Sequence, residues 1–179
     1  MTAIEPWQTA EIAGPKRASV IIKPEVADAM IQRAKHPVLI IGHLSAAIDL
    51  DDHKMIDYLL LLAQKGRIPI IGTGNTNREL QKRGYREAGI MPAVDIGQRL
   101  CDPTWKGLDG KEPYDLAIFA GLPYYMEWTI LSGLKHFAPH IKTMTLDNTY
   151  QPHAHWSFAN ISVKDWLENL KAIIENLEG

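Results

Sequence analysis

The chain has 179 residues, of which 46% are hydrophobic and 22% charged, and these proportions are typical of a single globular domain with a packed core. A formal net charge of -2 argues against the broad basic surface that attracts nucleic acid or an anionic membrane. The sequence lacks both the apolar run of roughly 20 residues that spans a bilayer and a signal peptide, which predicts a soluble cytoplasmic protein.

The first 23 residues mix prolines, small residues and charges, so we expect an N-terminal arm over residues 1–23. Its end, Ser19–Lys23, is a short β-branched run that either pairs with a sheet or packs on one. Pro24 suits the first turn of a helix, and apolar residues at helical spacing predict a helix over Glu25–Lys35. Residues 24–179 contain no linker and are expected to form one domain.

Two apolar runs bounded by proline and glycine, Val38–Gly42 and Ile68–Gly72, are typical of strands that are buried on both faces of a parallel sheet. Between them, an apolar stripe predicts a helix over Asp51–Lys65. The N-terminus of this helix, where negative charge is favourable, would then lie beside Asp49, Asp51 and Asp52. Strand, helix and strand of this length predict a right-handed βαβ unit.

The middle of the chain is less regular. We expect a short helix over Arg78–Arg83 and a helical turn over Ile96–Leu100, while Tyr85–Asp95 could be strand or turn. Cys101–Pro113 is rich in Pro, Gly and Asp, which predicts a loop.

A second βαβ unit follows, with a strand at Leu116–Gly121, a helix at Pro123–Phe137 and a strand at Ile141–Asp147. We expect a short edge strand within Ser157–Asn160 and a final helix over Val163–Leu177, capped by Ser162. This alternation predicts an α/β fold: a three-layer open parallel sheet with helices on both faces.

The candidate ligand site lies where three strands end in glycine. In an open α/β sheet the carboxyl ends of the strands line a common crevice, and glycine lets a backbone amide approach a phosphate. The predicted cofactor-binding residues are Gly42, His43, Gly72, Thr73, Gly74, Asn75, Gly121 and Tyr124.

Each of these glycines has a plainer explanation, because a tight turn or close helix packing also selects glycine. The sequence Gly72-Thr73-Gly74 lacks the third glycine of the G-x-G-x-x-G fingerprint, and no P-loop motif is present. His43 could contact a ligand or cap a helix. The pattern therefore indicates a cleft without naming its ligand.

No catalytic set emerges from the sequence. His153 and His155 would share one face of an extended segment, but no nearby residue completes a metal site. The acidic residues at Asp49–Asp52 and Asp109–Asp115 are explained by helix-end and loop positions. Cys101 is the only cysteine, which excludes an iron–sulfur cluster held by this chain alone.

Several segments together carry a family resemblance. They are Asp102-Pro103-Thr104-Trp105-Lys106-Gly107-Leu108-Asp109-Gly110, Tyr114-Asp115, the pair Tyr124-Tyr125, Lys35–Gly42, Ile68–Gly74 and Ser157–Ser162. From about Pro24 onward the chain resembles the epsilon subunits of the archaeal acetyl-CoA decarbonylase/synthase (carbon monoxide dehydrogenase) complex. The family works in one-carbon metabolism and methanogenesis.

The resemblance implies a fold similar to the NAD/FAD-binding superfamily that includes the central domain of thiamine-diphosphate enzymes. It also implies a non-catalytic role beside the metal-bearing alpha subunit, with two alpha and two epsilon chains in a larger complex that reversibly cleaves acetyl-CoA. Epsilon would stabilise alpha or assist electron transfer to FAD. Trp105 and Tyr124 or Tyr125 are the expected interface anchors.

The alternative is an independent enzyme of the same superfamily that binds NAD or FAD through its strand-end glycines. Its weak point is the missing acid–base or nucleophilic set.

Overall fold

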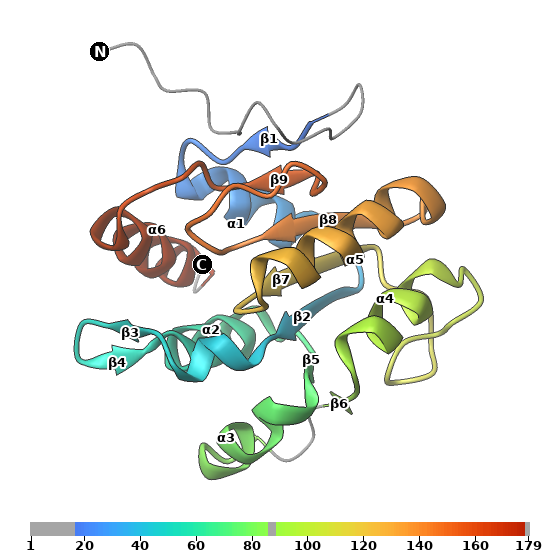
Figure 1. The fold of residues 1–179 in the computed structure, drawn as a ribbon, viewed down its shortest axis with the longest axis horizontal. Coiled ribbons are helices and arrows are strands. Elements are labelled where there is room, and N and C mark those ends of the chain that lie inside the picture. Colours follow the sequence, from blue (N-terminus) through green and yellow to red (C-terminus); the bar gives the residue numbers. More distant parts are fainter. Residues whose placement is uncertain (1–16, 86–88, 178–179) are drawn as a thin grey trace.

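The computed structural model describes residues 17–85 and 89–177, so most of the predicted arm lies outside the described residues. Within them, seven strands form one parallel sheet in the order β1-β9-β8-β7-β2-β5-β6 (Figure 1). The strands are β1 (Ser19–Val20), β2 (Pro37–Ile41), β5 (Ile70–Gly72), β6 (Gly89–Ile90), β7 (Leu116–Ala120), β8 (Lys142–Thr145) and β9 (Trp156–Ser157).

Helices cover both faces of this sheet, which confirms the predicted three-layer α/β fold (Figure 1). One face carries α1 (Pro24–Arg33), α2 (Met55–Gly66) and α6 (Val163–Asn176). The other carries α4 (Ala93–Cys101) and α5 (Tyr124–Phe137). A six-residue helix, α3 (Asn77–Lys82), follows β5.

The central strands are apolar on both faces because each face meets a helical layer. In β2, Leu39 and Ile41 pack toward α2 and α6, whereas Val38 and Ile40 pack toward α4 and α5. All four side chains are buried. This two-sided burial explains why β2 and β7 were readable as continuous apolar runs.

The chain runs outward from the centre of the sheet in two directions. From β2 it continues to β5 and β6 on one side, and from β7 to β8 and β9 on the other. Neighbouring β2 and β7 therefore flank the point where the strand order reverses, and in open α/β sheets ligands bind outside the carboxyl ends of the strands at that point.

The predicted helix over Asp51–Lys65 begins too early. Residues 49–54 form a β-hairpin of β3 (Asp49–Leu50) and β4 (His53–Lys54), and α2 begins only at Met55. Asp51 occupies the hairpin turn in the left-handed region, with φ 59°. The acidic cluster thus serves a turn, a role to which Asp is suited. The carboxylate at the start of the helix is Asp57, which accepts the backbone N–H of Lys54 at 2.9 Å.

Two further segments differ from expectation. The expected helical turn over Ile96–Leu100 is the nine-residue helix α4, whose Ile96 and Leu100 are buried under α5. The short C-terminal strand lies at Trp156–Ser157 and is internal, because β1 pairs beyond it and forms the edge. Ser19–Lys23 therefore does contribute a paired strand.

The last helix follows the prediction closely. Ser162 Oγ accepts the backbone N–H of Asp165 at 3.1 Å, the N-cap bond expected from the sequence. Trp166, on the first turn of α6, is buried and donates its indole N–H to the carbonyl oxygen of Leu146 at 2.7 Å. Among the helices of the described residues, none is both long and apolar enough to cross a bilayer.

Candidate functional site

The first and third glycine turns, at Gly42 and Gly121, lie against each other at the carboxyl ends of β2 and β7. A Cβ at Gly42 would overlap the carbonyl oxygen of Gly121, so the two backbones meet where a side chain cannot fit. Gly121 also has φ +74°, which L residues rarely adopt. Both glycines are thus required by the fold itself.

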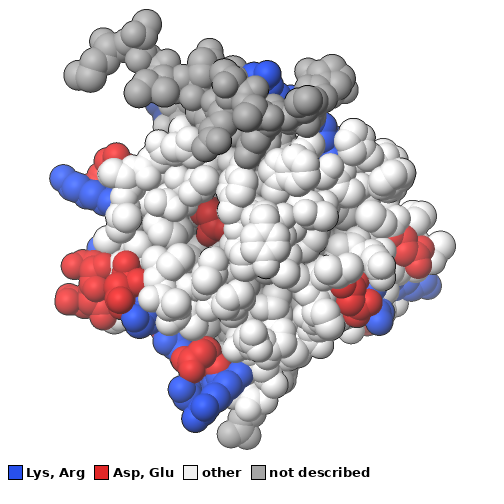
Figure 2. Space-filling model, viewed as in Figure 1, with Lys and Arg blue, Asp and Glu red and all other residues white. Residues whose placement is uncertain are grey.

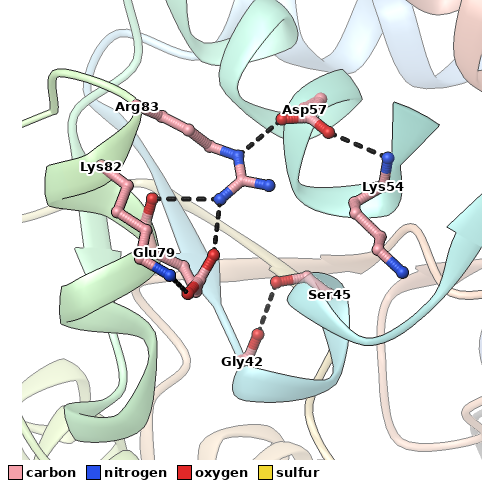
Figure 3. Close-up of polar contacts among 7 residues, drawn as sticks. All are labelled: Gly42, Ser45, Lys54, Asp57, Glu79, Lys82 and Arg83. Carbon is pink, nitrogen blue, oxygen red and sulfur yellow. Dashed lines mark hydrogen bonds and ion pairs between the residues drawn. The ribbon is translucent and has the colours of Figure 1, made fainter.

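The polar groups of these two turns are already paired within the protein. The N–H of Gly42 donates to Ala120 O at 2.9 Å, and the hydroxyl of Ser45 donates to Gly42 O at 2.6 Å (Figure 3). The N–H of Gly121 donates to both carboxylate oxygens of Asp147, at 2.9 and 3.1 Å. An incoming phosphate would therefore have to displace protein acceptors at both positions.

The middle turn is built differently. A Cβ at Gly72 would crowd the side chain of Leu80, so this glycine serves the packing of α3. Thr73 and Thr76 share a hydrogen bond between their hydroxyls at 2.9 Å and are buried. Gly74 and Asn75 are exposed, and a Cβ at Gly74 would meet nothing within 4 Å.

A pocket of about 200 Å³ opens at the point where the strand order reverses. Of the eight residues predicted from the sequence, only Gly121 and Tyr124 line it. Gly42 packs behind it, His43 is exposed beside it, and Gly72, Thr73, Gly74 and Asn75 lie farther along the same edge of the sheet. The apolar walls are formed by Leu44, Ile48, Leu122 and Trp166.

Two carboxyl groups form the polar part of this pocket. Glu127, one turn into α5, and Asp147, just after β8, both line it, and Glu127 is fully buried. Burial and the charge of Asp147 raise the pKa of Glu127 well above its usual value. Burial likewise raises the pKa of Asp147 to about 6, although the bonds from Glu127 and Gly121 act in the opposite direction. At neutral pH the pair therefore holds a shared proton.

Both carboxylate oxygens of Glu127 and the amide oxygen of Gln151 are buried and form no hydrogen bond of good geometry within the described residues. The side chains of Thr145, Asp147 and Gln151 nevertheless lie close enough to Glu127 to influence its pKa. Gln151 uses its amide nitrogen to donate to Tyr124 O at 3.2 Å, which leaves its oxygen as an acceptor. Across residues 17–85 and 89–177, neither carboxyl group forms an ion pair with Lys, Arg or His.

This pair was not predicted from the sequence, in which no catalytic set emerged. A signal was present, because Glu127 stands three and four residues before Ile130 and Leu131, on the buried side of a helix. A lone carboxylate on an apolar helix face, together with an aspartate at a strand end, marks a candidate site.

The groups at the Gly42 and Gly121 turns do not suit a flavin. The amides that would hold its pyrophosphate are occupied, and the carboxylate of Asp147 would repel a second anion. The open turn at Gly74 and Asn75 carries no such obstacle. The cofactor prediction stays a prediction.

A second polar cluster lies between α2 and α3 (Figure 3). Arg83 donates to Asp57 at 2.6 Å and to the carboxylate of Glu79 at 2.8 Å, and Lys82 pairs with Glu79 at 2.7 Å. Although burial raises the pKa of Asp57, its bonds from Arg83 and Lys54 lower it overall. Every charge here has a partner, so the cluster joins the two helices and leaves no group for a ligand.

The two histidines weighed for a metal site do separate things. His153 is buried, packs edge-on against Trp128 with ring centroids 4.6 Å apart, and has no hydrogen-bond partner among the described residues. His155 instead accepts the backbone N–H of Thr143 through Nδ1 at 3.1 Å. Burial and nearby cationic groups lower the pKa of His153 to about 4, so its ring is neutral.

The loop that carries the family resemblance has a defined shape. Gly107 and Gly110 have φ of +70° and +72°, and Tyr114 accepts the N–H of Leu108 through its hydroxyl at 3.0 Å. The ring of Trp105 packs edge-on against Tyr114, with centroids 5.5 Å apart. The glycines are thus required by backbone geometry.

Comparison with known proteins decides the family. The model of the family described as "CO dehydrogenase beta subunit/acetyl-CoA synthase epsilon subunit" matches residues 1–174. The chain belongs to this family. Its members include an acetyl-CoA decarbonylase/synthase complex subunit epsilon from Methanothermobacter thermautotrophicus, 36% identical over 94% of this chain and 93% of the relative.

A second member, subunit epsilon 1 of Archaeoglobus fulgidus, is 38% identical over 90% of this chain and 86% of its own. A third, from Methanothrix soehngenii, is 35% identical over 88% and 81%. The epsilon-subunit resemblance predicted from the loop and strand segments is therefore confirmed over nearly the whole chain.

Proposed function

We propose that this chain is an accessory subunit of an acetyl-CoA decarbonylase/synthase complex and that it binds and stabilises the alpha subunit of the carbon monoxide dehydrogenase component. Its family membership supports a subunit role. Cys101 is half-buried and burial raises the pKa of its thiol, so it is poorly suited to ligate a metal.

The observation that carries the binding part of this proposal is the uncharged outer face of α5. Tyr125, Thr129, Ser132 and His136 recur at helical spacing on the side opposite the core. Tyr125 is 69% exposed, and Phe137 at the end of the same helix is 74% exposed. Exposed aromatic residues on a surface poor in charge are typical of protein interfaces.

Figure 2 shows this character on a wider scale. The viewed face is largely uncharged across its middle, and Lys, Arg, Asp and Glu gather toward its margins. Depletion of charge at the centre with a charged rim is the composition of a protein-binding surface. This composition supports an alpha-subunit contact on the α5 side of the sheet.

Co-expression of the chain with alpha tests this directly. A double Tyr125→Ala and Phe137→Ala variant should bind alpha at least tenfold more weakly than the unaltered chain, because interface aromatic residues often contribute about 2 kcal/mol or more. Alpha alone should lose thermal stability relative to the complex.

Leu61→Ala is the matched control. Leu61 is 40% exposed on α2, the helix layer on the opposite face of the sheet. The Leu61→Ala variant should bind alpha as tightly as the unaltered chain. Equal weakening by both variants would refute the α5 surface, and failure of the unaltered chain to associate would refute the subunit role.

The finer proposal, that the subunit assists electron transfer to FAD, has its own test. The full chain is titrated with FAD, alone and with alpha, and the flavin fluorescence is followed. Quenching that saturates and is reduced by Asn75→Ala would support a flavin at the exposed Gly74–Asn75 turn. No quenching at millimolar FAD in either state would refute it.

A further inference from the structure

A partner that covered the Glu127–Asp147 pocket with apolar groups alone would not pair its acidic side chains. Glu127 is fully buried and Gln151 is 1% exposed, yet three of their oxygen atoms form no hydrogen bond of good geometry within the described residues, and both residues line the same small cavity. A buried polar atom with poor hydrogen bonding destabilises the protein, the more so when it is charged. A group that entered the cavity and donated to these oxygens would relieve that cost.

The floor of the pocket is acidic. Glu127 and Asp147 line it beside the amide oxygen of Gln151, and Asn148 and Thr149 complete its polar lining. The two carboxyl groups favour a positively charged ligand that donates hydrogen bonds. A phosphate, a carboxylate or a metal-free nucleotide diphosphate would meet acceptors and like charge.

Size and walls narrow the ligand further. The cavity of about 200 Å³ is smaller than the roughly 300 to 1,000 Å³ of sites for drug-sized molecules. Leu44, Ile48, Leu122 and Trp166 surround the acidic floor with apolar surface. A cationic head on an aliphatic stem matches both parts, because arginine and lysine bury their methylenes against apolar walls while their heads are paired.

The surroundings indicate where that stem comes from. Tyr124, 37% exposed, lines the mouth of the pocket, and Tyr125 is the first residue of the uncharged α5 outer face. Acidic atoms are visible among uncharged residues near the middle of the face in Figure 2. A deep pocket within an aromatic surface is the usual setting of an interface hot spot, and such anchors are often arginine.

We propose that the Glu127–Asp147 pocket receives the guanidinium or ammonium group of an arginine or lysine side chain from the partner subunit that binds the α5 outer face. The inference rests on the proposed function, because it assumes that a partner covers α5. Charge complementarity between the acidic floor and the inserted side chain then fixes the register of the two proteins.

The decisive measurement is the affinity of the full chain for alpha with and without Glu127→Gln. Gln is nearly isosteric, but unlike Glu127 it cannot give up a proton to pair with the cation, and it adds a donor that faces the incoming group. Losing one partner of a buried charge pair typically costs at least 2 kcal/mol, so the dissociation constant should rise about thirtyfold or more. Glu79→Gln, in the ion-pair cluster between α2 and α3, should leave the dissociation constant unchanged.

A small-molecule arm identifies the chemistry and its source. The isolated chain is titrated with n-butylguanidine and with its neutral analogue n-butylurea, and the indole N–H resonance of Trp166 is followed by NMR. Butylguanidine should shift this resonance saturably, butylurea should not, and Glu127→Gln should abolish the shift. Equal response to both probes would overturn the cation assignment.

The outcomes separate this inference from the proposed function. If the unaltered chain binds alpha and Glu127→Gln binds equally well, the side-chain anchor is wrong and the subunit role stands. If butylguanidine binds but Glu127→Gln leaves the alpha affinity unchanged, the pocket serves a free small cation and the partner assignment is overturned. If the unaltered chain ignores alpha, the proposed function fails, and the butylguanidine titration alone decides whether the pocket accepts cations.

Discussion

Replacing Glu127 by Gln should make the isolated chain more stable at neutral pH, against the usual outcome of a buried substitution. The carboxyl group of Glu127 is fully buried, and burial and Asp147 raise its pKa well above the usual 4.5. The folded protein therefore keeps this proton at pH values where the unfolded chain releases it. Stability is then lost as pH rises above about 4.5.

The magnitude follows from proton linkage. Each pH unit between the unfolded and the folded pKa costs about 1.4 kcal/mol of unfolding free energy. From pH 4.5 to pH 7.5 the loss amounts to at most about 4 kcal/mol for Glu127, and Gln cannot incur it. The variant should match the unaltered chain at pH 4.5 and exceed it increasingly toward pH 7.5.

Urea unfolding of both proteins at several pH values between 4.5 and 7.5 measures this difference. A stability difference of about 4 kcal/mol would correspond to a rise in melting temperature of about 8 to 16 °C for a chain of this length. Glu79→Gln is the control, because hydrogen bonds from Lys82 and Arg83 lower the pKa of Glu79, and its replacement should give no stabilisation at any pH. A Glu127→Gln variant that is no more stable at pH 7.5, or that differs equally at both pH extremes, would refute the buried shared proton.

Three other predictions concern the rest of the chain. Gly42→Ala should destabilise the protein by at least about 3 kcal/mol, because the new Cβ would overlap the backbone of Gly121. Gly74→Ala should be neutral or slightly stabilising. Thermal unfolding compares the two variants, and equal effects would contradict the packing described. The unaltered chain should lose stability as the pH falls from about 6.5 to 4, because in this range His153 gains a proton only in the unfolded state. His153→Phe should abolish this loss. Parallel profiles of stability against pH for the two proteins would argue against a neutral buried ring. Asp115→Asn should lower the free energy of unfolding by about 1 to 3 kcal/mol, because Asp115 accepts the backbone N–H groups of Lys35 and His36 at 2.8 and 2.9 Å. Chemical unfolding measures this loss. An unchanged midpoint would show that water replaces the carboxylate as acceptor.

The fold was largely readable because its signal is local. The apolar runs at Val38–Gly42 and Leu116–Gly121 are continuous, since both faces of each strand meet helices, and parallel sheets carry this pattern. The hairpin before α2 was not readable. Three aspartates before an apolar stripe suit a helix N-terminus as well as a turn, and only the left-handed backbone of Asp51 shows which applies.

The candidate site was only half readable for a related reason. Its position follows from topology, which collects strand ends at one edge, and Gly121 and Tyr124 do reach the pocket. Its chemistry depends on Glu127 and Asp147, which are 20 residues apart and belong to different elements. Their shared proton arises from proximity and burial, neither of which a local pattern encodes.

The edge strand β1 bears on how the chain assembles itself during synthesis. Ser19 and Val20 are synthesised well before their partners in β9, Trp156 and Ser157. Closing so long a loop carries a large entropic cost for two residue pairs, so this pairing forms after the central strands. By the same reasoning it opens first, and the backbone N–H of Ile21, which donates to Ser157 O, should exchange with solvent faster than the amides of β2.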